Sequence, residues 1–114
     1  MVEKSFVFGV EIVKTVRTLK VNTKEYELLS QLLRSGTSVG ANVTEAQKAQ
    51  TGKDFVAKMS IASKEASEAV YWLRLLEASG VVTIETAKPL LEKAYELERL
   101  LISIIKTKQK NLKN

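Results

Sequence analysis

Hydrophobic residues recur three and four positions apart along most of this chain, the period of long helices that pack lengthwise on one another. Three segments follow it: Leu29, Leu32, Gly36, Val39, Val43 and Ala46; Phe55, Met59, Ala62, Ala66, Ala69, Leu73 and Leu76; Ala87, Leu90, Ala94, Leu97, Leu101 and Ile104. Near the N-terminus two adjoining rows predict a wide buried stripe: Phe8, Ile12, Val16 and Leu19 beside Phe6, Val10 and Val13. The pattern therefore predicts four amphipathic helices.

The signals at helix ends place these helices over about residues 5–20, 24–49, 52–78 and 86–108. Asn22 or Thr23 is the expected cap of the second helix, and Thr51 that of the third, with Asp54 three residues on. Gly80 supplies the stop after the third helix. Pro89 conflicts with a helix that begins after Thr83, so we expect a start after Thr86, with a kink near Lys88 as the alternative.

Short connections make successive helices antiparallel neighbours, so the expected fold is an all-α, up-down-up-down four-helix bundle with left-handed crossings. Gly36 and Gly40 would interrupt the second helix on propensity alone. The unbroken period predicts one continuous helix instead. The two glycines lie one turn apart, and we expect them to admit the face of the third helix that carries Ala62 and Ala66.

Composition limits the chemistry. The 114 residues form one expected domain, 1–114, and are 45% hydrophobic and 27% charged. Cysteine and histidine are both absent, so thiolate and imidazole catalysis and the usual zinc ligands are excluded. We therefore expect no enzyme and no cofactor. No apolar run approaches a membrane span, and the first residues do not resemble a signal peptide; a cytoplasmic protein is expected.

The net charge of +5 is concentrated at the C-terminus, where residues 106–114 hold four lysines and no acid. We expect residues 107–114 to be a basic, frayed end. Such an end can attract nucleic acid, although lysines also complement the dipole of a helix C-terminus. The candidate nucleic-acid contacts are Arg17, Lys20, Lys106, Lys108, Lys110 and Lys113.

Two polar rows flank the apolar seams of the second and third helices, and side chains at this spacing are neighbours. The candidate residues of a polar network or subunit contact are Arg34, Ser38, Asn42, Glu45, Asp54, Lys58, Glu65 and Glu68. The alternatives are a solvated flank with weak surface ion pairs or a Mg or Mn site made by Glu45, Glu65 and Glu68. Three glutamates on two helices are commonplace, so no metal is expected.

The middle of the chain carries a specific string, QLLRSGTSVGANVTEA at residues 31–46, followed by KDFVAKMSIASKEA at 53–66 and YWL at 71–73. It resembles the bacterial four-helix-bundle proteins first noticed as reading frames inside intervening sequences of large-subunit (23S) ribosomal RNA genes. The opening SFVF and closing IIK are similar too, so the resemblance covers nearly the whole chain. Thr44, Ser63 and Ser67 depart from it by being small.

The resemblance implies a bundle that assembles into a ring, a pentamer. The chain is also similar to the accessory variability protein of diversity-generating retroelements, a basic pentameric barrel that binds nucleic acid and a reverse transcriptase. The expected function is thus a non-enzymatic, homo-oligomeric interaction module whose further partner is RNA, DNA or another protein. A nucleic-acid-binding accessory protein is the first alternative, and a glutamate-ligated metal bundle is the second.

Overall fold

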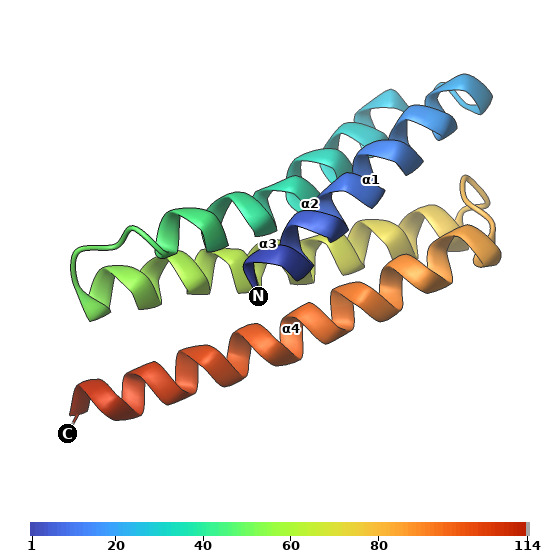
Figure 1. The fold of residues 1–114 in the computed structure, drawn as a ribbon. Helices are drawn as coiled ribbons and strands as arrows, with labels where there is room; N and C mark the ends of the chain where they lie inside the picture. Colours follow the sequence, from blue (N-terminus) through green and yellow to red (C-terminus); the bar gives the residue numbers. More distant parts are fainter. Residues whose placement is uncertain (114) are drawn as a thin grey trace.

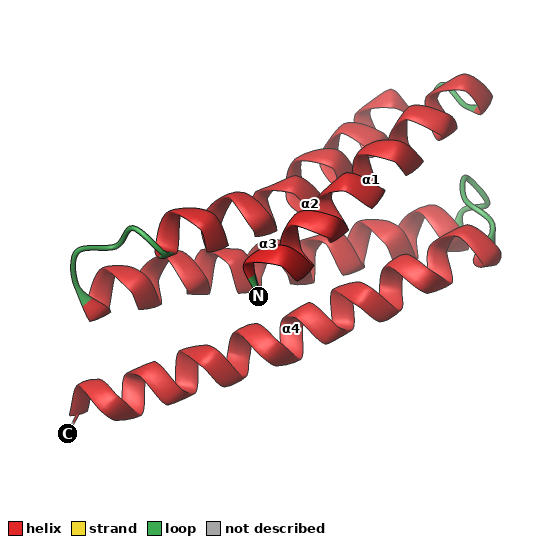
Figure 2. Ribbon diagram, in the orientation of Figure 1, coloured by secondary structure: helices red, strands yellow, loops and turns green. Residues whose placement is uncertain are grey.

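The computed structural model describes residues 1–113, which form four helices: α1 (Val2–Asn22), α2 (Tyr26–Ala46), α3 (Gly52–Ala78) and α4 (Ile84–Lys113). Successive helices run in opposite directions along an elongated molecule of 52 × 20 × 20 Å (Figure 1). Figure 2 shows that the connections lie at the two ends of the bundle. The predicted all-α, up-down-up-down bundle is confirmed, while the hand of its crossings stays a prediction. Within the described residues no helix is both long and apolar enough to cross a membrane.

The apolar seams of α2, α3 and α4 form the core. Every predicted seam position is buried except Phe55 and Ile104, which are half-buried and pack against the edge of the core. The predicted continuous helix through Gly36 and Gly40 is also confirmed. Burial of the seams decides the helix, because the two glycines cost only ~2 kcal/mol of helix propensity together, whereas each large apolar side chain contributes about 1.5–3 kcal/mol.

The observed helix ends agree only in part with the predicted ones. Thr51 accepts a hydrogen bond from the backbone N–H of Asp54 at 3.0 Å, and Gly80 has φ +81° as the residue that ends α3. Helix α2 begins after Glu25, with no side-chain cap, so the predicted caps are wrong. Thr23 instead accepts from the N–H of Glu25, because the chain is extended at Thr23 before it turns into α2.

Helix α4 is longer than expected at both ends. It begins at Ile84, where the Thr83 hydroxyl accepts from the N–H of Thr86, so the predicted start after Thr86 is wrong. Pro89 lies inside the helix and has no N–H to donate. The carbonyl that would have accepted this hydrogen bond lies in the exposed first turn, where water can satisfy it. The helix continues to Lys113. Fraying of the basic C-terminus at 107–114 stays a prediction, and residue 114 lies outside the described residues.

Gly36 and Gly40 face α1 and allow it to approach closely, so the prediction that they face α3 is wrong. A Cβ on Gly36 would lie 2.8 Å from Cγ1 of Ile12, and one on Gly40 would lie 3.1 Å from the backbone oxygen of Ser5. The α3 residues Ala62 and Ala66 are fully buried in the core. Small residues on α2 thus let α1 approach it closely.

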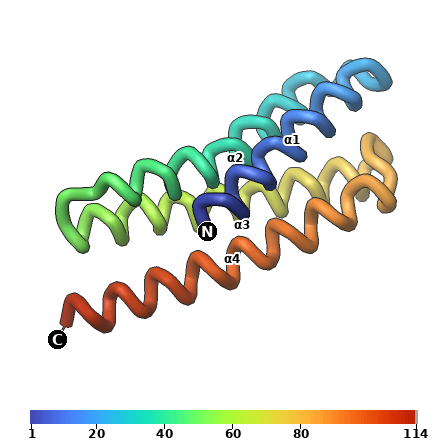
Figure 3. Tube along the Cα trace, in the orientation of Figure 1, coloured from blue at the N-terminus to red at the C-terminus, as the bar shows by residue number. Residues whose placement is uncertain are grey.

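Helix α1 is attached mainly to α2 and meets α4 at few points. Two ion pairs cross from α1 to α4, Lys4 to Glu96 at 3.5 Å and Glu11 to Lys93. The trace in Figure 3 shows that the N-terminus lies beside the middle of α4, whereas the C-terminus reaches the end where α2 connects to α3. One end of the bundle is therefore built from α2, α3 and α4 without α1.

Candidate functional site

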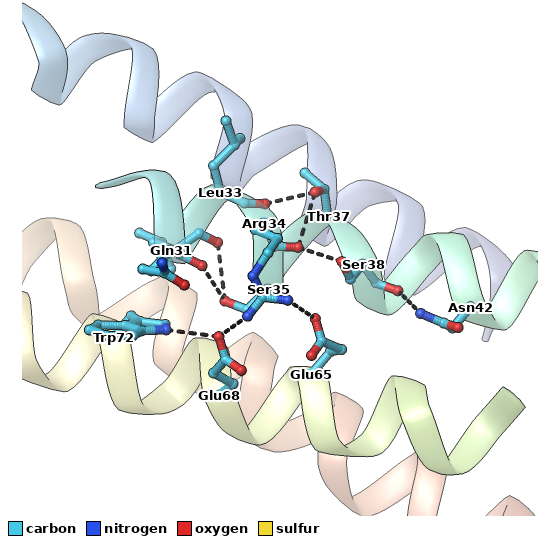
Figure 4. A network of polar contacts seen from close by, with 11 residues as sticks. Gln31, Leu33, Arg34, Ser35, Thr37, Ser38, Asn42, Glu65, Glu68 and Trp72 are labelled. Carbon is cyan, nitrogen blue, oxygen red and sulfur yellow. Dashed lines mark hydrogen bonds and ion pairs between the residues drawn. The ribbon is translucent and has the colours of Figure 1, made fainter. Parts of the chain in front are cut away.

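An ion-pair network joins α2 to α3 around Arg34. Its Nη1 donates to Oε2 of Glu65 at 2.8 Å, and its Nη2 donates to Oε2 of Glu68. The indole Nε1 of Trp72 donates to the same oxygen of Glu68 at 3.0 Å. Figure 4 shows the guanidinium extending from α2 between the two carboxylates of α3, with Trp72 one turn beyond Glu68. Three of the eight predicted polar residues are thus brought together, and Trp72 joins them.

The network shifts the pKa values of two of its own groups, Glu68 and Arg34. The hydrogen bond from Trp72, helped by the bonds and charge of Arg34, lowers the pKa of Glu68 below its ordinary value of 4.5 against the effect of partial burial. The hydrogen bond to Glu68 and the charges of both glutamates raise the pKa of Arg34. Glu68 therefore stays ionised at neutral pH, and the ion pairs of Arg34 make the network a charged clasp between two helices.

The other predicted polar residues are placed differently. Lys58 pairs with Glu45 at 3.3 Å, a second link between α3 and α2. The side chains of Ser38 and Asn42 donate hydrogen bonds to backbone oxygens of their own helix, those of Arg34 and Ser38 respectively. Asp54 is exposed in the first turn of α3. Ser38 and Asn42 are polar residues whose hydrogen bonds are met locally, which is common for these side chains in helices.

The carboxylates do not form a cluster that suits a metal ion. Arg34 lies between Glu65 and Glu68, in the place that a cation would need, and Glu45 is paired with Lys58. Within residues 1–113, no three acidic side chains lie close enough together to hold a metal. The arrangement of these glutamates therefore favours helix pairing by basic side chains.

A groove of about 630 Å³ runs along the outer face of α1 and α2. On the α1 side it is lined by Phe6, Gly9, Val10 and Val13, and on the α2 side by Thr37, Gly40, Ala41 and Thr44. Phe6 is 65% exposed, and Val10 and Val13 are only half-buried. The predicted burial of this second α1 row is therefore wrong: close packing on Gly36 and Gly40 turns Phe8, Ile12 and Val16 inward and leaves the other row on the surface.

The rim of the groove is charged, with opposite signs at its two ends. Glu45 lies beside the Phe6 end, and Lys14 and Arg17 lie farther along α1. Sequence reasoning missed this site because it assigned both apolar rows of α1 to the core. The signal that could have revealed it is the width of the stripe, since one row already suffices for a helix at the edge of a bundle.

The predicted nucleic-acid contacts fall into two groups that lie far apart. Arg17 and Lys20 are near the α1–α2 connection, where they border a small hollow with Val16 and Leu33. Lys106, Lys108, Lys110 and Lys113 are at the opposite end of the bundle (Figure 1). Lys108 lies over the ring of Phe55, 5.7 Å from its centroid. The six residues cannot form one surface within a single chain.

Trp72 makes the Glu68 interaction observable, because it is the only tryptophan in the chain. The lowered pKa of Glu68 stabilises the fold above the ordinary carboxyl pKa, and this stabilisation is lost as pH falls through the lowered value. We expect a change in Trp72 fluorescence with a midpoint below the ordinary carboxyl pKa of 4.5, absent in Glu68→Gln. Circular dichroism recorded in parallel separates it from unfolding. A midpoint above the ordinary value, or an unchanged titration in Glu68→Gln, would contradict the assignment.

Comparisons with known proteins agree with this architecture. The chain is similar to a protein of unknown function from the S23 ribosomal protein family of Bacteroides thetaiotaomicron, whose crystal structure matches with a TM-score of 0.90 and 45% sequence identity. The match covers 92% of this chain and 97% of that chain. No curated protein matches the sequence. The sequence profile of the 23S rRNA-intervening sequence proteins matches residues 1–103. The chain therefore belongs to the 23S rRNA-intervening sequence protein family.

Proposed function

We propose that the protein is a non-enzymatic, self-assembling interaction module, in which the groove between α1 and α2 is the contact between copies. The single observation that carries the proposal is the exposure of Phe6 on one continuous apolar surface with the half-buried Val10 and Val13. A large aromatic side chain left in water beside an apolar groove is typical of a protein contact. The resemblance described above implies a ring of five copies.

The charges along the groove restrict how a second copy of the chain can lie on it. Lys14 and Arg17 make one end of the apolar strip positive, whereas Glu45 at the other end is paired with Lys58 of its own chain. In a ring the neighbouring copy would lay a different surface on this groove, because ring contacts are head-to-tail, and acidic side chains of that surface opposite Lys14 and Arg17 would favour the correct register. The floor is made of small residues, Gly9, Gly40 and Ala41, so a side chain of the partner can approach the backbone.

The test replaces Phe6 by glutamate and measures molar mass by light scattering. Because a buried carboxylate without a partner costs several kcal/mol, we expect the oligomer to dissociate into folded monomers. Tyr26→Glu is the matched control, since Tyr26 is also an exposed aromatic residue, at 51%, but lies outside the groove. Its mass should equal that of the wild type.

Two results would overturn the proposal. One is a Phe6→Glu variant that keeps the wild-type mass while Tyr26→Glu does too, because the groove would then not be the contact. The other is equal dissociation of both variants, because the effect would then not depend on the groove. Circular dichroism of each variant establishes that a lower mass belongs to folded protein.

A further inference from the structure

The end of the bundle that lacks α1 gathers lysines that are far apart in the sequence. Lys48 lies in the α2–α3 connection and Lys53 in the first turn of α3, while Lys106, Lys110 and Lys113 lie on the last turns of α4. The two segments are in contact: Lys108 covers the ring of Phe55, and a Cβ on Gly52 would touch the side chain of Leu112. Figure 1 shows this connection and the C-terminus at the same end. We call the five lysines the basic end.

The whole net charge of the protein is located there. Residues 45–58 and 106–113 contain seven lysines and two acids, a balance of +5, and the remaining residues contain eleven basic and eleven acidic side chains. All five lysines of the basic end are exposed. Within the described part of the chain, none of them forms an ion pair, whereas Lys4, Lys58 and Lys93 do.

Helix stability does not account for this arrangement. Lys53 is in the first turn of α3, next to the positive end of the helix dipole, where a cation is unfavourable. On α4, Lys110 is four residues from Lys106 and three from Lys113, and like charges at these spacings repel one another. Only the lysines of the last turn complement the dipole of α4. An external polyanion would neutralise all five.

We propose that the basic end binds the phosphate backbone of a double-stranded nucleic acid. Lys106, Lys110 and Lys113 form one stripe along α4, and Lys48 and Lys53 lie at the same end of the bundle, in the α2–α3 connection and in the first turn of α3. The contact reads charge and not base sequence, because the aromatic ring of this end, Phe55, is half-buried beneath Lys108 and does not offer a free face for stacking.

The test measures binding of the intact protein to a mixed-sequence DNA duplex and an RNA duplex, each about two helical turns long, over a salt series. Release of counterions by five lysines predicts a slope of about −4 to −5 for DNA, a loss of several hundred-fold in affinity between about 50 and 200 mM salt. Lys48→Gln/Lys53→Gln should reduce this slope by about two and weaken binding by roughly tenfold or more.

The matched control is Lys20→Gln/Lys24→Gln, which removes two exposed lysines at the opposite end of the bundle and should leave the slope unchanged. Equal effects of the two double variants, or no duplex binding at low salt, would overturn the proposal. Binding to anionic lipid vesicles without binding to either duplex would overturn it as well. The molar mass of each variant, measured in the same buffer, keeps this result separate from the fate of the proposed assembly.

Discussion

Replacing Gly36 by valine is expected to destabilise the fold by about 2–3 kcal/mol, because the site has no room for a side chain. A Cβ there would lie 2.8 and 2.9 Å from Cγ1 and Cγ2 of the fully buried Ile12 and 3.2 Å from its Cβ. These atoms are close to the α1 backbone, so relief requires α1 to move away from α2. Urea unfolding followed by circular dichroism measures the loss.

A double-mutant cycle with Ile12→Ala tests the stated cause. Ile12→Ala alone should cost about 2–5 kcal/mol by leaving a cavity. In the Gly36→Val background it should cost much less, because the valine occupies that space, and the coupling should reach about 1–3 kcal/mol. Additive effects would mean that Gly36→Val acts by another route, and the close approach of α1 to α2 would not depend on this glycine.

Replacing Arg34 by alanine is expected to lower the free energy of unfolding by about 1–3 kcal/mol. The substitution leaves two carboxylates of α3 facing each other across the emptied site, and the side chain of Glu65 is only 15% exposed. Arg34→Lys should restore part of the loss, since an ammonium supplies the charge but not the two directed N–H groups. Thermal or urea unfolding at neutral pH measures both variants.

Two comparisons make the Arg34 result specific. Lys4→Ala breaks an ion pair whose side chains are both about half exposed and should cost less than about 1 kcal/mol. In a Glu65→Gln/Glu68→Gln background, Arg34→Ala should cost little, because no carboxylate is left unpaired. An equal loss in both backgrounds would show that Arg34 stabilises the bundle through its packing on α2 instead of through the clasp.

Hydrophobic spacing predicted the fold because nearly every buried position lies on a 3.5-residue seam, and the seam persists through Gly36 even where local propensity favours a break. It could not predict which helix the glycines face. That choice depends on how four helices are arranged around the core, and both α1 and α3 offer suitable apolar partners. Pro89 misled for a related reason: burial of the α4 seam outweighs one missing hydrogen bond at an exposed first turn.

The candidate site was predictable only where its parts lie on one face of one helix. The rows that contain Arg34 and Glu65 follow from helical spacing, but their pairing required the register between α2 and α3. Trp72 joins Glu68 through a spacing of four residues that was present in the sequence. The groove and the basic end were missed. One depends on Phe6 facing away from the core, and the other joins Lys48 to Lys110 across about sixty residues of chain.

Assembly of copies of this chain through the groove between α1 and α2 requires an oligomer in solution. The most direct test is the molar mass of the wild-type protein, determined by light scattering over a dilution series in moderate salt. A single mass that is a whole multiple of 12.7 kDa, five-fold if the implied ring forms, and that persists on dilution is the predicted result. A mass of 12.7 kDa at every concentration would contradict it and would leave Phe6 an exposed side chain without a partner copy.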